Sequence, residues 1–356
     1  MEKKEQKIYS GIDLFKLVAA VLIVVLHAIE TTSWYSNEVK FVITRFAVPF
    51  FFIASGFFFF KGLNAAKDHK AYFIKYEMNI LKIFVIWALI IYLPFTIKGY
   101  AEKYLYEGGI GVVKFFLLLF RRVFVIGSGP YWYLIALMLS AAFIYICFNR
   151  KSDSLLKAGI IIGFILEIAY SCFQGILSNI KVFGLLFKVI YAVWSWEYNF
   201  LMFGIPFMGI GYLICKKNIS WTAKGSVTVF FISTLIRIFE YNLPVLFPSD
   251  FWNNNAISFA FIPQALAYFL LAKNIKLNWS KEKSINVRQL SSCIYFSHAI
   301  FLYEFLNPFL DTYTGLPVYA DRMIVWKVII TLLCCLVLYV IVKMINNKHL
   351  NILING

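Results

Sequence analysis

Four ionisable side chains lie in or beside one apolar stretch near the N-terminus, residues 12–30, IDLFKLVAAVLIVVLHAIE. They are Asp13, Lys16, His27 and Glu30. A helix of 3.6 residues per turn brings Lys16 and His27 to within ~20° of one line, with Asp13 ~40° away and Glu30 one turn beyond His27. A charge at membrane depth is costly unless it faces a cavity or a partner. The aligned set therefore predicts a polar cavity that runs inward from the cytoplasmic face.

These residue types can do chemistry near neutral pH. An imidazole gains or loses a proton in that range, and a lysine ammonium is a compact positive charge. Each residue alone also has a simpler interpretation. Lys16 could extend to the membrane surface, and His27 could be a buried histidine that hydrogen-bonds a neighbouring helix.

The composition identifies the class of protein that must position these residues. The chain has 356 residues, of which 61% are hydrophobic and only 15% are charged, whereas soluble domains have about 25% charged residues. Several apolar stretches reach the ~20 residues that cross a bilayer. The sequence thus predicts an all-α polytopic membrane protein, formed as one domain over residues 1–356. The Lys-rich start is not followed by a signal-peptide cleavage site.

Ten transmembrane helices are expected from the apolar runs. Their predicted ranges are 12–33, 41–60, 79–97, 131–148, 158–174, 198–215, 225–241, 256–272, 290–307 and 324–342.

The distribution of Lys and Arg predicts the orientation. With the N-terminus in the cytoplasm, 20 of the 34 Lys and Arg residues fall in cytoplasmic loops and tails, which favours N-in and C-in topology. The formal net charge of +16 then reflects membrane topology, and no nucleic-acid partner is expected. The expected partner of the protein's apolar outer surface is membrane lipid.

Residues 99–130 would lie outside, yet they carry four Lys or Arg residues and an amphipathic stretch. We expect an interfacial or re-entrant helix at 110–126. If that segment crossed the membrane instead, the count would be eleven and the charge bias of every later loop would be reversed.

The six cysteines fall in predicted helices and are expected to pack as small apolar residues, without a disulfide framework. There is no CxxC motif and no His/Cys cluster, so no metal site is expected.

Five motifs, in order, resemble the acyltransferase family 3 membrane proteins. The family signature is an arginine, ten residues and a histidine in the first helix, and this chain has lysine in place of the arginine. The motifs are KLVAAVLIVVLH (16–27), RFAVPFFFIASGFFFF (45–60), GPYWYLIALMLS (129–140), YNFLMFGIPFMGIGYLI (198–214) and SSCIYFSHAIFLYEF (291–305). The chain is also similar to the membrane halves of vancomycin-type membrane serine racemases.

The family resemblance implies transfer of an acyl group, usually acetyl, from cytoplasmic acyl-CoA to a hydroxyl of an envelope glycan or another small hydroxylated acceptor. The donor's phosphates require cations at the cytoplasmic mouth, where Lys16 is expected to lie, paired with Asp13. Many relatives carry an arginine pair after the second helix. Here Lys75 and Lys82 are the only counterparts, and we assign them to the donor as well.

His27 is then the candidate base or acyl carrier, and Glu30, one turn away, is expected to orient it. Arg45, near the outer face, either stabilises an oxyanion, holds an acidic acceptor or binds headgroups.

The remaining candidates are assigned to the acceptor. Glu197 and Asn199 begin the sixth helix at the outer level, and His298 lies in the ninth-helix motif. Trp132 and Tyr133 either stack on the acceptor or belong to an interfacial aromatic belt.

Two other classes of function fit the same residues. A transporter or exporter of a small polar solute such as an amino acid is suggested by the racemase resemblance, and a sensor or assembly partner would need the polar stripe only as structure. The Lys-, Asn-, Ile- and Phe-rich composition is typical of a low-GC bacterium, so the expected location is a bacterial plasma membrane.

Overall fold

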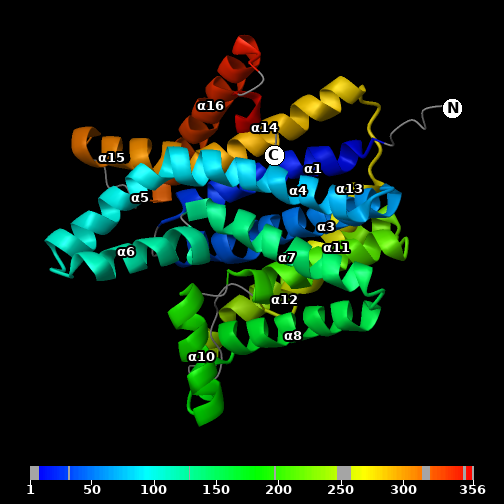
Figure 1. Ribbon diagram of the computed structural model, residues 1–356, viewed down its shortest axis with the longest axis horizontal. Helices are drawn as coiled ribbons and strands as arrows, with labels where there is room; N and C mark the ends of the chain where they lie inside the picture. Colours follow the sequence, from blue (N-terminus) through cyan, green and yellow to red (C-terminus); the bar gives the residue numbers. More distant parts are fainter. Residues whose placement is uncertain are drawn as a thin grey trace.

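The protein is built from helices that lie side by side in one bundle (Figure 1). The computed structural model describes residues 8–30, 33–127, 129–195, 198–246, 258–314, 321–347 and 350–354, and the regular elements in these ranges are all helical. The α-helices are α1 Ser10–Ala28, α2 Trp34–Glu38, α3 Ala47–Ala65, α4 His69–Phe84, α5 Leu93–Tyr100, α6 Val112–Phe120, α7 Trp132–Asn149, α8 Asp153–Ser171, α9 Gln174–Leu177, α10 Lys181–Trp194, α11 Ile205–Lys216, α12 Ala223–Leu246, α13 Phe261–Asn274, α14 Lys281–Ala299, α15 Asn307–Phe309 and α16 Asp321–Ile345.

Wider π-helical turns extend several of these helices. They are η1 Val39–Thr44, η2 Val85–Tyr92, η3 Ala101–Tyr106, η4 Arg121–Ile126, η6 Phe200–Gly204, η7 Ile300–Leu306 and η8 Leu310–Thr314. Two short 3₁₀ turns are η5 Gly129–Tyr131 and η9 Leu350–Leu353. Such π turns often occur at functional sites.

Seven helical stretches in the described part of the chain are long and apolar enough to cross a membrane. They are Ser10–Ala28, Ser36–Ala65, His69–Tyr106, Gly129–Asn149, Asp153–Ser171, Ala223–Pro244 and Asp321–Ile345. The protein is therefore an all-α polytopic membrane protein, as the composition predicted.

The other three segments predicted to cross the membrane are helical too, but each differs from a simple apolar span. Phe200–Lys216 is apolar and shorter, and α13 has 14 residues. Helix α14 is long but polar on average, because its serines, His298 and Arg288 face α1 and a cavity described below.

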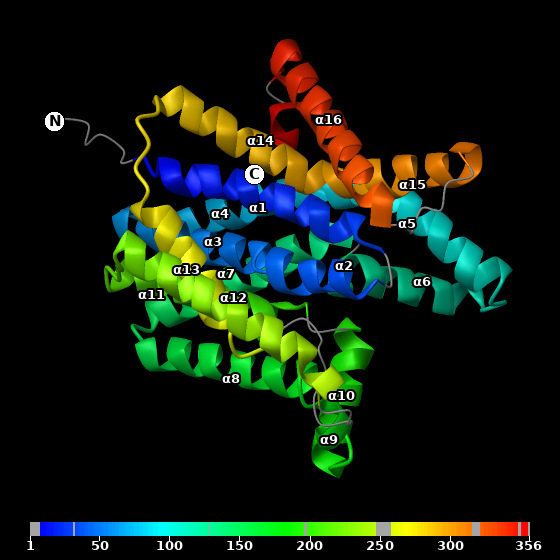
Figure 2. The ribbon, with the colours of Figure 1, turned by 180° about the vertical axis from the view of Figure 1, so that it is seen from behind.

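The loops rich in Lys and Arg gather at one end of the bundle, next to the start of α1 (Figures 1 and 2). The Ser10 hydroxyl donates to the Leu277 carbonyl, and Lys273 donates to the Ile219 carbonyl. Lys216 forms an ion pair with Asp153. We call this the cytoplasmic end, following the predicted orientation.

The predicted interfacial or re-entrant segment at 110–126 is helical and forms a hairpin. Helices α5 and α6 project together past the end of α1 opposite the N-terminus (Figure 1). The chain then turns at Gly127, whose φ of 85° is in the left-handed region, and enters η5 and α7. The segment thus leads back to the start of α7. The predicted alternation of the later loops across the membrane stays a prediction.

Helix α10 lies steeply across the bundle axis, as an amphipathic surface helix does (Figure 2). Its last carbonyls are bound by Arg121 of η4. The guanidinium donates to the carbonyls of Val193 and Tyr191 at 3.1 and 2.9 Å and to the Ser195 hydroxyl at 2.8 Å. A cation at a helix C-terminus also interacts favourably with the helix dipole.

Helices α3 and α11 pack with their backbones almost in contact. A Cβ atom at Gly56 would collide with the carbonyl oxygen of Met208, and one at Gly211 would collide with that of Ile53. Glycine at these two positions therefore permits the close approach of the two helices. This contact fixes α3, which carries Phe51 and Ser55 toward the site.

Candidate functional site

Helices α1 and α14 form a parallel pair that carries candidate residues at two levels. Asp13 accepts a hydrogen bond from the Ser284 hydroxyl, and His27 packs against His298 with ring centroids 5.1 Å apart and an interplanar angle of 34°. Both pairs are separated by 271 residues in the chain. The two helices are thus in register, with the two levels roughly 21 Å apart along the axis.

We call the level of Asp13 the lower level and the level of His27 and His298 the upper level. The lower level opens into a cavity of about 1580 Å³ at the cytoplasmic end. Five of its lining side chains are cationic, and Asp13 is its one acidic side chain among the described residues. The cations are Lys16, Lys61, Lys82, Lys281 and Arg288. Such an excess of positive charge favours a ligand with several negative groups.

Asp13 is not paired with Lys16, so that expectation was wrong. Its carboxylate lies 3.5 Å from Nε of Arg288 on α14 and accepts from Ser284. The Lys16 ammonium lies over the Phe58 ring at 5.4 Å from its centroid. Lys16 lies on the same helix as Asp13, whereas the Arg288 guanidinium reaches the buried Asp13 carboxylate from the adjacent helix α14.

The cavity narrows to hydroxyl and aromatic groups at its inner end. The Ser55 hydroxyl and the Tyr133 hydroxyl are 3.1 Å apart. Phe51 and Tyr295 also line the cavity there, with ring centroids 5.4 Å apart. The Tyr295 ring is in turn 6.2 Å from the ring of His298. The inner end of the cavity therefore adjoins the upper level.

The predicted polar stripe of α1 does not face one continuous cavity. Asp13 and Lys16 line the cytoplasmic cavity, whereas His27 and Glu30 lie beyond its inner end among residues of α14, η7 and α16. Tyr295 and Phe51 separate the two levels because their rings fill the space beside α1.

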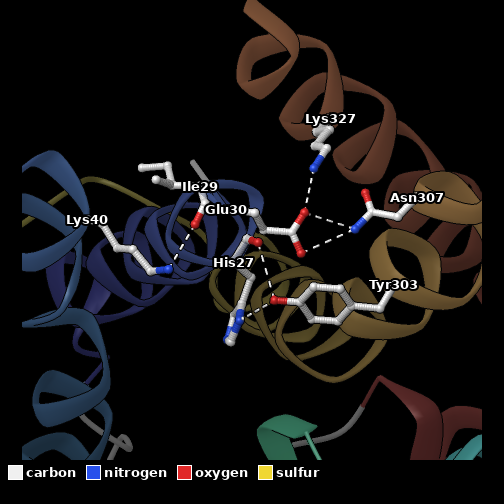
Figure 3. Close-up of polar contacts among 7 residues, drawn as sticks. All are labelled: His27, Ile29, Glu30, Lys40, Tyr303, Asn307 and Lys327. Carbon is white, nitrogen blue, oxygen red and sulfur yellow. Dashed lines mark hydrogen bonds and ion pairs between the residues drawn. The ribbon is translucent and has the colours of Figure 1, made fainter. Parts of the chain in front are cut away.

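His27 is held by Tyr303 of η7 (Figure 3). Its Nδ1 lies 2.9 Å from the Tyr303 hydroxyl, which is also 3.3 Å from the His27 carbonyl oxygen. A hydroxyl has one hydrogen to donate and also accepts. Tyr303 therefore accommodates either neutral tautomer of His27.

His298 is fully buried and hydrogen-bonded on one side only. Its Nδ1 lies 2.7 Å from the Tyr295 carbonyl oxygen and 3.1 Å from that of Ile294, both in its own helix. Its Nε2 has no hydrogen-bond partner among the described residues. A buried polar atom without a partner is uncommon and is typical of functional positions.

Glu30 does not orient His27, as was expected from its position one turn away. Its carboxylate accepts from Lys327 of α16 at 2.6 Å and from the Asn307 amide at 3.1 and 3.3 Å, pointing away from the His27 ring (Figure 3). α1 ends at Ala28, so Glu30 lies outside the helix and is free to reach another partner.

Two cations surround the end of α1. The Lys40 ammonium donates to the Ile29 carbonyl at 2.8 Å and so binds the C-terminal end of the helix. Arg45 lies over the Phe41 ring at 4.3 Å and over the Tyr198 ring at 5.4 Å. Arg45 is thus held by aromatic groups near the outer level, and its role in oxyanion or acceptor binding stays a prediction.

Of the other residues predicted for donor or acceptor binding, some line the cytoplasmic cavity and others do not. Lys82 and Tyr133 line the cytoplasmic cavity, whereas Lys75 is exposed and outside its lining. Trp132 packs within the protein, 5.4 Å from the Tyr198 ring and 5.7 Å from that of Phe203.

Asn199 caps a helix. Its side-chain oxygen accepts from the backbone N–H groups of Leu201 and Met202, which explains its residue type without an acceptor substrate. Glu197 lies outside the described residues, so its assignment to the acceptor stays a prediction.

At the lower level, sequence reasoning missed Ser284 and Arg288, which contact Asp13. At the level of His27 and Glu30 it missed Lys327, Tyr303 and Asn307. Lys327 was detectable, because it is a charged residue within the apolar stretch predicted at 324–342. Tyr303 and Asn307 gave weaker signals, since Tyr303 is one of three aromatic residues in η7 and Asn307 lies where the predicted ninth helix ends.

These observations define a class: a polytopic helical membrane protein with a cationic cavity at one end and, beyond it, a pair of histidines of which His298 is buried and His27 is half-buried. The family model of the acyltransferase domain matches residues 9–345. The chain belongs to this acyltransferase family, as its motifs suggested.

Three relatives are similar over much of the chain. An amino-acid racemase of Enterococcus faecalis is 26% identical over 243 residues, covering 66% of this chain and 32% of that protein. A second amino-acid racemase of that species is 23% identical over 301 residues, covering 82% and 40%. A serine/alanine racemase of Enterococcus gallinarum is 23% identical over 238 residues, covering 65% and 32%. The chain thus spans about a third of these relatives' length, and no solved structure matches it.

Proposed function

We propose that the protein is an integral-membrane O-acyltransferase of a bacterial plasma membrane. It takes an acyl group, acetyl in the simplest case, from cytoplasmic acyl-CoA and transfers it to a hydroxyl of a cell-envelope glycan or another small acceptor. Family membership supports acyl transfer. The donor, the acceptor and the location are part of the proposal.

The cationic cavity supports the choice of donor. Acyl-CoA carries several phosphate charges on one end and an uncharged thioester on the other. The cavity has five cations among its lining residues and hydroxyl and aromatic groups at its inner end. Lysine and arginine bind phosphate through charge-assisted hydrogen bonds, and uncharged walls suit a pantetheine arm.

The observation that supports the proposal is the position of the two histidines just beyond the inner end of the cavity, next to its lining residue Tyr295. Tyr295 lines the cavity and lies 6.2 Å from the His298 ring, which lies 5.1 Å from the His27 ring. A thioester at the inner end of the cavity would be close to an imidazole, the group best suited to acyl and proton transfer near neutral pH. In the reaction, the acyl carbon exchanges its bond to sulfur for a bond to the acceptor oxygen.

The decisive experiment uses purified protein in nanodiscs with radiolabelled acetyl-CoA and soluble peptidoglycan fragments. We expect free CoA thiol to appear together with labelled, base-labile ester. His27→Ala should lower this rate by about 10²-fold or more, the usual range for loss of an acid–base group. His69→Ala is the matched control, because His69 begins α4 and packs against Phe148, away from this site.

Full transfer activity in His27→Ala would remove the catalytic assignment. Absence of thiol release by the wild-type protein with glycan, glycerol or water as acceptor would contradict acyl-CoA-dependent transfer itself.

A second candidate is transport of a small polar solute such as an amino acid. It is favoured by one observation, the racemase names of the relatives that match this region. Proteoliposomes loaded with labelled serine or alanine distinguish the two functions. A transporter gives flux without consumption of acyl-CoA, and the acyltransferase gives thiol release without flux.

A further inference from the structure

The two histidines differ in a way that assigns them different roles. Both hydrogen-bond partners of His298 Nδ1 are backbone carbonyl oxygens, at 2.7 and 3.1 Å. A carbonyl oxygen only accepts, so Nδ1 must carry the hydrogen. In the neutral ring the other nitrogen, Nε2, then carries no hydrogen and has a lone pair that can accept one.

His27 is not restricted in this way. Its Nδ1 partner is the Tyr303 hydroxyl at 2.9 Å, which donates or accepts. When Tyr303 donates to Nδ1, the Nε2 of His27 carries the hydrogen. The pair can therefore present one bare nitrogen, on His298, and one N–H donor, on His27.

The unprotonated Nε2 of His298 is buried, so it cannot accept a hydrogen bond from bulk water. His298 is 0% exposed, and its Nε2 has no partner among the described residues. A buried acceptor that accepts no hydrogen bond is unfavourable, because it has lost its bonds to water. Side chains that pack against His298 are aromatic, Tyr295 and His27 among them, so neither bulk water nor a described side chain satisfies this atom.

We propose that His298 is the proton acceptor of the acyl-transfer step, and that His27 serves the same step as a hydrogen-bond donor. This inference rests on the proposed acyltransferase function. It changes the assignment of His298 from acceptor binding to acid–base chemistry. It also requires that the Tyr303 hydroxyl donate its hydrogen to Nδ1 of His27, at 2.9 Å, rather than to the His27 carbonyl oxygen, at 3.3 Å.

The step balances without any further reactant. The acceptor hydroxyl gives its proton to Nε2 of His298 as its oxygen bonds to the thioester carbon. The charge that develops on the carbonyl oxygen is met by the Nε2–H of His27. The carbon–sulfur bond then breaks, and the leaving thiolate takes the proton from His298, which restores both neutral rings.

Substitution by asparagine separates the two nitrogens of His298. An asparagine amide offers an N–H near the position of Nδ1, so the bonds to the Ile294 and Tyr295 carbonyls are kept, while the acceptor at Nε2 is lost. We expect His298→Asn in nanodiscs to lower the rate of acetyl transfer from acetyl-CoA to peptidoglycan fragments by about 10²- to 10⁴-fold. KM for acetyl-CoA should change by no more than about threefold, because the donor's charged groups bind elsewhere.

Ser297→Ala is the matched control on the same turn of α14. Ser297 donates to the Cys293 carbonyl of its own helix and contacts Cys335, so its loss perturbs local packing without touching the histidine pair. We expect its transfer rate to stay within about threefold of the wild type.

Chemical rescue keeps the proposal testable if His298→Asn is poorly folded. His298→Ala leaves a space the size of the ring, and added imidazole should restore at least about a tenth of the lost activity, whereas it should not restore His298→Gln, which fills that space.

Transfer by His298→Asn at more than a third of the wild-type rate would overturn the inference, and so would failure of imidazole to rescue a folded His298→Ala. These results leave acyl transfer intact if the wild-type protein is active and His27→Ala is not. An inactive wild-type protein would instead overturn the proposed function, and this inference with it.

Discussion

The ion pair between Glu30 and Lys327 ties the end of α1 to α16, and its removal gives a measurable loss of stability. The Lys327 side chain is 1% exposed and Glu30 is 22% exposed, with 2.6 Å between Nζ and the carboxylate. Removal of one partner of a buried pair costs about 3–5 kcal/mol, because a buried charge is left uncompensated. Since Glu30 is partly exposed, we expect Glu30→Ala to cost about 3 kcal/mol, the lower end of that range.

Thermal unfolding in detergent provides the assay. At about 2 °C per kcal/mol, the low end of the range that suits a large chain, Glu30→Ala should lower Tm by about 6 °C. Lys327→Met should cost less, about 1–2 kcal/mol, because Glu30 retains the Asn307 amide and some contact with water. The double variant should be about as stable as Lys327→Met alone, which corresponds to a coupling of about 3 kcal/mol.

The exposed ion pair between Asp153 and Lys216 is the matched control. Its side chains are 37% and 35% exposed, so its removal should cost no more than about 1 kcal/mol. Additive losses in the Glu30 and Lys327 variants would refute the reasoning. The same variants also test whether Glu30 orients His27 in catalysis. If it did, the double variant would lack acyl-transfer activity even though it is more stable than Glu30→Ala.

Three further perturbations test the donor cavity, the surface helix and the helix packing. Lys16→Gln should raise KM for acetyl-CoA by about threefold to tenfold, because it removes a cation from the cavity lining. Lys75→Gln is the control, because Lys75 lies outside that lining, and it should leave steady-state kinetics unchanged. Equal effects of the two substitutions would contradict the donor site. Arg121→Ala should lower stability by about 1–3 kcal/mol through three lost hydrogen bonds at the end of α10, without changing KM, as measured by thermal unfolding and kinetics. Gly56→Ala should cost about 3 kcal/mol or more, since the added methyl group collides with the Met208 carbonyl. The yield of monodisperse protein on gel filtration should fall with it. An unchanged yield and Tm would show that α3 and α11 can separate freely.

The sequence predicted the features that depend on local pattern. Apolar runs of membrane length located the helices, and the turn-by-turn spacing placed Lys16 and His27 on one side of α1. Only Lys16 lines the cavity, whereas His27 contacts Tyr303 and His298 beyond its inner end.

The partners of the charged residues could not be predicted in the same way. Asp13 and Glu30 each have a cation nearby in sequence or on the same face, but their partners in the structure are Arg288 and Lys327, on α14 and α16. A choice between a near lysine and a distant one depends on which helices become neighbours, and single-sequence periodicity carries no information about that. The hydrogen bonds that fix the tautomer of His298 likewise depend on a rotamer that only tertiary packing selects.

The register between α1 and α14 also has a consequence for how the protein is made. The residues that meet in this pair are 271 positions apart, so α14 leaves the ribosome after nearly all other helices. At about 5–20 residues per second, α1 waits roughly 15–55 s in the membrane before the partner of Asp13 and His27 is synthesised. During that time its polar face must be covered by earlier helices, by water or by the insertion machinery. Synthesis of α14, rather than insertion of the first helix, is thus the event that creates the histidine pair.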